Sequence, residues 1–305
     1  MKKTPIRLLV FLFPILLVWG AVEFFYRSVP NNYTLKYDYM ERHASEVEVL
    51  LLGNSHSLFG LNPDYFSKKA FNLANISQTI YFDQLLFNRY IDKMDHLKQV
   101  VFCIEYSSLS HKDDTHEDTF RKYYYENYMQ LDVPTVSAWD PKKYSLAFTR
   151  NLKQTWDIYQ VYRIRGSVLD AKENGWGFTT LKELSIAPAK DAEEKAEIHE
   201  DGSLDFAVNL ARIEAMIEQC KQRNIEVVIV SMPQSRVYTS LLNPKKLALI
   251  FDTCEQLAAE HDHVRYLNLF SDRRFRDEDF FDSDHLNDEA AGKCLKMVNA
   301  FLQEK

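Results

Sequence analysis

Short apolar runs alternate with helical stretches along most of this 305-residue chain, and this alternation constrains its fold more than any other feature. Apolar runs bounded by turn residues are typical of buried strands, whereas apolar residues spaced three and four apart predict helices packed on a sheet. The predicted strands are 47–52, 71–74, 99–104, 225–232 and 264–269. The predicted helices are 79–94, 204–223, 245–260 and 290–302. The pattern predicts an α/β fold, a three-layer sandwich around a mainly parallel sheet.

The first part of the chain has a different pattern. Leu8 to Val22 carries no charge, and residues 6–26 would make a helix about 30 Å long, enough to cross a bilayer. Lys2, Lys3 and Arg7 precede this run, so the positive-inside rule places the N-terminus in the cytoplasm. We expect a single-pass anchor over 1–27 and an extracytoplasmic domain over 28–305. A cleaved signal peptide is the alternative, although no A-x-A-like cleavage site follows the run.

Composition excludes several classes of function. The chain has 37 basic and 44 acidic residues, for a net charge of −7, and no long basic run, which argues against a nucleic-acid partner. Its eight glycines form neither of the common nucleotide-binding loops, and no cofactor is expected. The stretch from about 110 to 200 breaks the strand–helix rhythm, and we interpret it as an insertion within the domain. Its segment HKDDTHED is rich in metal-ligating residue types but lacks a ligand spacing, so no metal site is predicted.

Two segments far apart in the chain carry residues suited to nucleophilic catalysis. Ser55 follows the strand VEVLLL directly, in GNSHS, and ligands bind at the carboxyl ends of parallel strands. A serine hydroxyl needs a base, and the base needs a group that orients it. Asp282 and His285 lie three residues apart just before the last predicted helix, where the carboxylate can orient the imidazole. Asp284 is the alternative orienting group, with poorer geometry expected because it adjoins His285.

These two segments together resemble the SGNH, or GDSL-type, hydrolase superfamily, over roughly residues 46–110 and 204–302. The resemblance implies an SGNH/flavodoxin-like fold, with Ser55 as nucleophile, His285 as base and Asp282 as its orienting group. In the second block the backbone N–H of Gln78 takes the place of the family's glycine N–H in the oxyanion hole. The third-block G-x-N-D is missing, and Asn75 is the expected substitute for its asparagine.

Two other interpretations stay open. The α/β-hydrolase elbow requires G-x-S-x-G, but position 57 is Ser. Alternatively, Ser55 only caps a helix and His285 is a polar residue before another. His56, beside Ser55, is interpreted as a loop residue and not as a second base.

The order of anchor, early Ser and late Asp-x-x-His is similar to that of the teichoic-acid D-alanylation protein and of partners of membrane-bound O-acyltransferases. This resemblance implies a serine esterase or O-acyltransferase on the outer, periplasmic side of a bacterial cytoplasmic membrane. Its substrate would be O-acyl groups, acetyl above all, on a cell-envelope polysaccharide, and its partner a membrane-bound O-acyltransferase. The alternative is a weakly active or inactive SGNH domain that binds glycan and assists such an acyltransferase.

Overall fold

The computed structural model describes residues 3–113, 119–178 and 188–304. By its internal contacts the chain divides into two compact units. One, the sheet unit, comprises residues 38–118 and 170–305; the other, the anchor unit, comprises residues 1–37 and 119–169. The boundaries expected from the sequence, 1–27 for an anchor and 28–305 for a domain, stay a prediction.

The sheet unit contains five parallel strands in the order β2-β1-β3-β4-β5. They are β1 (Val49–Leu52), β2 (Ala70–Asn72), β3 (Gln99–Cys103), β4 (Glu226–Ser231) and β5 (Val264–Asn268). This is the strand order of flavodoxin-like doubly wound sheets, in which the order reverses between β1 and β3. The predicted α/β class with a parallel sheet is confirmed, and a crevice is expected beyond the carboxyl ends of these two strands.

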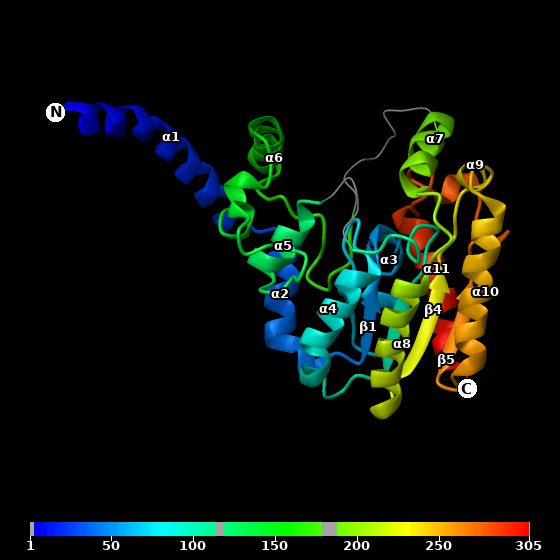
Figure 1. Cartoon of the computed structure of the whole chain (residues 1–305). Helices are drawn as coiled ribbons and strands as arrows, with labels where there is room; N and C mark the ends of the chain where they lie inside the picture. Colours follow the sequence, from blue (N-terminus) through cyan, green and yellow to red (C-terminus); the bar gives the residue numbers. More distant parts are fainter. Residues whose placement is uncertain (1–2, 114–118, 179–187, 305) are drawn as a thin grey trace. The chain divides into compact units, whose positions relative to one another are not determined.

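Helices cover both faces of the sheet and make the three layers. The helices α4 (Ile80–Tyr90), α8 (Ala207–Gln222) and α10 (Pro244–Glu260) cover one face, and α3 (Ser55–Gly60) and α11 (Asp288–Gln303) cover the other (Figure 1). The core against α11 takes alternate strand residues such as Val49, Leu51 and Val101. This alternation follows from the two-residue period of a strand, whose successive side chains point to opposite faces of the sheet.

Shorter elements complete the sheet unit. They are the helices α7 (Pro188–His199) and α9 (Arg236–Thr239), and the 3₁₀ turns 44–46, 63–65, 91–93 and 277–279. Every strand and helix predicted from the sequence is present, with ends shifted by a few residues. The four cysteines, Cys103, Cys220, Cys254 and Cys294, are buried and unpaired.

The anchor unit is helical and begins with α1 (Lys3–Ser28). Helix α2 (Asn32–His43) starts in this unit, which also contains α5 (Arg121–Tyr128), α6 (Leu152–Arg165) and the 3₁₀ turns 141–143 and 146–148. From Val10 to Ser28, α1 is by length and composition able to cross a membrane, and 6% of that window is buried. This stretch is therefore not a core helix.

Candidate active site

The turn after β1 presents Ser55 at the carboxyl edge of the sheet. Gly53 has φ +124°, and a Cβ there would lie 2.7 Å from Cβ of Cys103 on the neighbouring strand. Only glycine fits this close, left-handed position. The Asn54 side chain then caps α3 by accepting from the N–H of His56. Ser55 is the first residue of α3, so its N–H has no acceptor within the helix and is available to a ligand.

Ser55, His285 and Asp282 form one hydrogen-bonded chain. The Ser55 Oγ lies 2.8 Å from Nε2 of His285, and Nδ1 of His285 lies 2.9 Å from Oδ2 of Asp282. The backbone N–H groups of Asp284 and His285 donate to Oδ1 of Asp282, which fixes the turn that carries them. The structure thus brings together the three residues that the sequence singled out for nucleophilic catalysis.

Asp284 is a second carboxylate at the same imidazole. Its side chain is fully buried, and its Oδ1 lies 3.0 Å from Nδ1 of His285. The contact from Asp282 has hydrogen-bond geometry, whereas the contact from Asp284 is an ion-pair distance without it. This difference favours Asp282 as the orienting group and leaves Asp284 as a buried charge beside the base.

Helix α7 places a cation between these carboxylates. The Nζ of Lys195 lies 2.5 Å from Oδ2 of Asp282 and also contacts Oδ1 of Asp284. One turn earlier, Asp191 accepts from the N–H of Ser283, which fixes the loop before His285. One turn later, Nδ1 of His199 lies 2.7 Å from the Tyr238 hydroxyl. This polar face was not predicted from the sequence, although Asp191, Lys195 and His199 have the four-residue spacing of one helical face.

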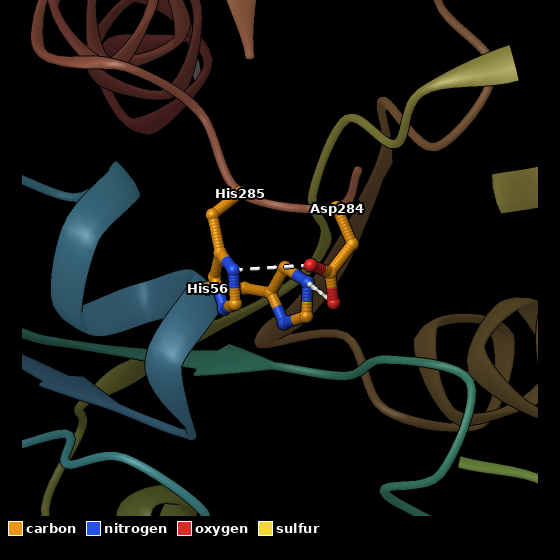
Figure 2. A group of neighbouring side chains, drawn as sticks. All are labelled: His56, Asp284 and His285. Atoms are coloured by element: carbon orange, nitrogen blue, oxygen red, sulfur yellow. Dashed lines mark ion pairs between the residues drawn. The ribbon is translucent and has the colours of Figure 1, made fainter. Parts of the chain in front are cut away.

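His56 is part of the site, and its interpretation as a loop residue is wrong. It lies within α3, it is buried, and its ring stacks on His285 with 4.6 Å between centroids. Its Nε2 lies 3.4 Å from Oδ2 of Asp284, the pairing drawn in Figure 2. Its position in the first turn of α3 follows from the Asn54 cap, which starts the helix before it.

The charges around His285 shift its pKa. Burial alone would lower this pKa, but Asp284 and Asp282 outweigh burial and raise it to about 10. Burial likewise opposes ionisation of Asp284, yet contact with His285 and His56 holds its pKa well below the usual range. The pKa of Lys195 is raised, because the same two carboxylates overcome its burial. At neutral pH the imidazolium form therefore prevails, with Nε2–H donating to Ser55; above its pKa, Ser55 donates to Nε2.

The cluster of His56, Asp284 and His285 is close enough to hold a metal ion, with its potential ligand atoms within 4.8 Å of one another (Figure 2). The ammonium of Lys195, however, already pairs with Asp284, and Nε2 of His285 faces Ser55. These contacts favour acid–base chemistry over metal binding. In the HKDDTHED segment, residues 114–118 lie outside the described residues.

The expected oxyanion donors differ in their surroundings. Asn75 is buried beside the nucleophile turn, since its N–H lies 3.4 Å from the Gly53 carbonyl, and its Nδ2 has no hydrogen-bond partner among the described residues. A buried donor without a partner is rare, and it suits an oxyanion. The backbone N–H of Gln78 donates to the Asn75 carbonyl, and its Nε2 donates to Asp83. Because the backbone N–H of Gln78, the donor expected from the sequence, is directed at Asn75, we build the proposed oxyanion hole without it.

Gln78 instead belongs to a buried support behind the turn. Oδ1 of Asp83 accepts from Nε2 of Gln78 and from the Gly53 N–H. Burial raises the pKa of Asp83 to about 7, although both hydrogen bonds lower it. The Asp83 carboxyl therefore fixes the backbone of Gly53, two residues before Ser55.

Comparison with known proteins gives weak similarities only. No family model matches the chain, and no curated protein matches it. A solved structure from Streptococcus pneumonia, provisionally named a platelet activating factor, aligns with a TM-score of 0.43 and 12% identity over 96% of this chain and 99% of its own. A protein from Bacteroides fragilis provisionally named an acylhydrolase has TM-score 0.43 and 12% identity, covering 87% and 96%.

A GDSL-like lipase from Bacteroides thetaiotaomicron has TM-score 0.42 and 12% identity, covering 88% of this chain and 99% of its own. Similarity at this level assigns neither fold nor activity.

Proposed function

We propose that this protein is a serine esterase or acyltransferase of the SGNH type, with Ser55 as nucleophile, His285 as general base and Asp282 as its orienting group. The hydrogen-bonded chain from Ser55 Oγ through His285 to Asp282 carries this proposal. Three side chains from opposite ends of the sequence rarely align in this order unless a proton is to move between them.

In the reactive state His285 is neutral, with Nδ1–H donating to Asp282. The Ser55 oxygen attacks the ester carbonyl carbon while its proton passes to Nε2. The tetrahedral oxyanion accepts hydrogen bonds from the Ser55 N–H and from Nδ2 of Asn75. When the C–O bond breaks, Nε2–H protonates the departing alkoxide, and an acyl-serine remains.

The acyl-serine is resolved by a second hydroxyl. Water gives hydrolysis, and a sugar hydroxyl gives transfer; in both cases His285 takes the proton of the incoming oxygen and returns a proton to Ser55. The rings of Phe59 and Phe281 lie 5.6 and 5.5 Å from that of His285 and make one wall of the site apolar. An apolar wall shields the imidazole and the attacking oxygen from water.

The substrate that we propose is an O-acyl ester, acetyl above all, on a cell-envelope polysaccharide. The proposal includes anchoring by α1 in a bacterial cytoplasmic membrane, with the sheet unit on the outer side. The apolar exposed helix and its preceding basic residues support it. The order of anchor, Ser and Asp-x-x-His supports a membrane-bound O-acyltransferase as partner.

Ester turnover by the full chain in detergent tests the enzyme proposal. We expect p-nitrophenyl acetate hydrolysis and fluorophosphonate labelling at Ser55, both abolished in Ser55→Ala. Ser57→Ala is the matched control, because Ser57 lies two residues away but is fully buried, and it should retain labelling. Activity that rises with acyl chain length would indicate a lipase instead. If the wild type neither turns over ester nor takes the label, the non-catalytic glycan-binding alternative replaces the enzyme proposal.

A further inference from the structure

The anchor unit has an unusually apolar surface outside its long helix. Among the described residues, eight exposed large hydrophobic side chains fall between Trp139 and Ile164, whereas the whole sheet unit has seven. Trp139 is 94% exposed, Ile164 83% and Leu152 71%. Exposed apolar side chains this frequent in one short segment are typical of a contact with a partner or a membrane.

The same stretch, residues 139–165, is also basic. It contains six Lys and Arg residues and two Asp residues, a net charge of +4 in a chain whose total is −7. We call it the interfacial segment. Mixed aromatic and basic side chains are typical of surfaces that lie on anionic lipid, where rings enter the headgroup layer and cations meet phosphate.

The interfacial segment adjoins the outer part of α1 within the same unit. The indole N–H of Trp19 donates to Oγ of Ser145 at 3.0 Å, and its ring stacks on Phe148 with 6.4 Å between centroids. Further along α1, Phe25 meets the rings of Tyr159 and Tyr162 on α6, each at 5.7 Å. These contacts begin at Trp19, whereas Leu8 to Val18 of α1 includes many exposed apolar side chains.

These contacts also locate charged groups on α1. Glu23 accepts from the Ser145 hydroxyl and from the Ala147 N–H, and Arg27 donates to the Tyr144 carbonyl. Glu23 and Arg27 also pair with each other at 2.5 Å, and an ionised pair belongs at a polar interface and not in the hydrocarbon layer, where charges are costly. Glu23, Arg27 and the part of the interfacial segment that they contact therefore lie at the headgroup level.

We propose that the interfacial segment lies on the anionic lipid surface around α1, with Trp139, Phe148 and Trp156 in the headgroup layer. This inference rests on the proposed anchoring by α1. It assigns residues 139–165 a membrane-contacting role, separate from the site around Ser55. The segment gives the anchor unit a second, broad attachment that limits its rotation about α1.

The four tryptophans of the chain allow a direct test, since 5-fluorotryptophan at residues 19, 139, 156 and 176 gives four assignable ¹⁹F signals. The full chain is placed in nanodiscs of phosphatidylcholine and phosphatidylglycerol. Nitroxide-labelled lipid should remove the signals of Trp19, Trp139 and Trp156, and a soluble gadolinium chelate should leave them. Trp176 is the internal control, because it is buried in the sheet unit and donates to the Phe59 carbonyl.

The outcomes separate this inference from the anchoring on which it rests. If lipid nitroxide spares Trp19 itself, the anchor proposal fails. If it removes Trp19 but spares Trp139 and Trp156, and gadolinium removes these two, the lipid contact is refuted and the surface serves a protein partner. In discs of phosphatidylcholine alone we expect Trp139 to become at least twofold more sensitive to gadolinium. Equal sensitivity would contradict the role given to the basic residues.

Discussion

Replacing Asp284 with Asn tests how charge controls the proposed base. The substitution keeps the size of the side chain and removes one of two negative charges beside His285. Because Asp284 and Asp282 raise the pKa of His285 to about 10, the neutral base is a minor form at pH 7. We expect wild-type kcat/KM for ester hydrolysis to rise with pH at values well above those at which histidines usually titrate. In Asp284→Asn, this rise, the acidic limb of the profile, should occur at lower pH.

The size of the movement follows from the distance of 3.0 Å between Asp284 Oδ1 and His285 Nδ1. Coulomb's law gives about 1.4 kcal/mol at this separation in a water-like dielectric and about 5.5 kcal/mol at an effective dielectric of 20. At 1.36 kcal/mol per pKa unit, the limb should fall by about one to four units. Lys195→Met should move it the other way, because the ammonium lies 3.4 Å from Nδ1 and opposes protonation.

The measurement is the pH profile of kcat/KM for both variants and the wild type, from pH 5 to 10, corrected with Ser55→Ala. Histidine NMR titration of His285 gives the same pKa without relying on activity. Other charged or titratable groups facing this cluster, His56, Asp191, His199 and Asp282, stay unchanged in both variants. Opposite shifts in the two variants support the charge argument. A wild-type limb near pH 6.5 that neither substitution moves would refute it.

Three further predictions concern the turn and its support. Asn75→Ala should lower kcat about 10²–10³-fold with little change in KM, as steady-state kinetics would show, because an oxyanion donor acts only in the transition state; a purely raised KM would contradict this. Asp83→Asn should gain stability relative to wild type as pH rises from 4 to 8, by about 4 kcal/mol for a folded pKa of about 7 against 3.8. The sign follows because a carboxyl group with a raised pKa stabilises the fold only while it is protonated, and wild-type Asp83 loses its proton over this range. Urea midpoints of variant and wild type that differ by the same amount at pH 4 and pH 8 would exclude this prediction. Gly53→Ala should not yield folded protein by circular dichroism, since its Cβ would lie 2.7 Å from that of Cys103; a native-like spectrum would show that the turn can shift.

The sequence predicted the layers of the sheet unit because strand and helix periods depend on local pattern alone. It also identified Ser55 and the Asp282–His285 pair, since parallel strands bring their carboxyl ends to one edge regardless of distance along the chain. The backbone around Gln78 was not predictable in this way. Whether a backbone N–H faces a ligand depends on the turn, and here Ser77, one residue before Gln78, has a left-handed backbone with φ +53°.

The role of α7 was hidden because its polar face has the composition of an exposed charged helix. Lys195 contacts Asp282 and Asp284 only once residues 188–199 pack beside the last loop. Without that ammonium, two ionised carboxylates would lie about the same imidazole with only its proton to balance them, and buried like charges repel strongly. The charges of Asp282, Asp284, Lys195 and protonated His285 sum to zero, and Asp191, 3.6 Å from Lys195, adds a further carboxylate. Helix α7, which the sequence assigned to an insertion, is therefore required for the charge balance of the proposed active site.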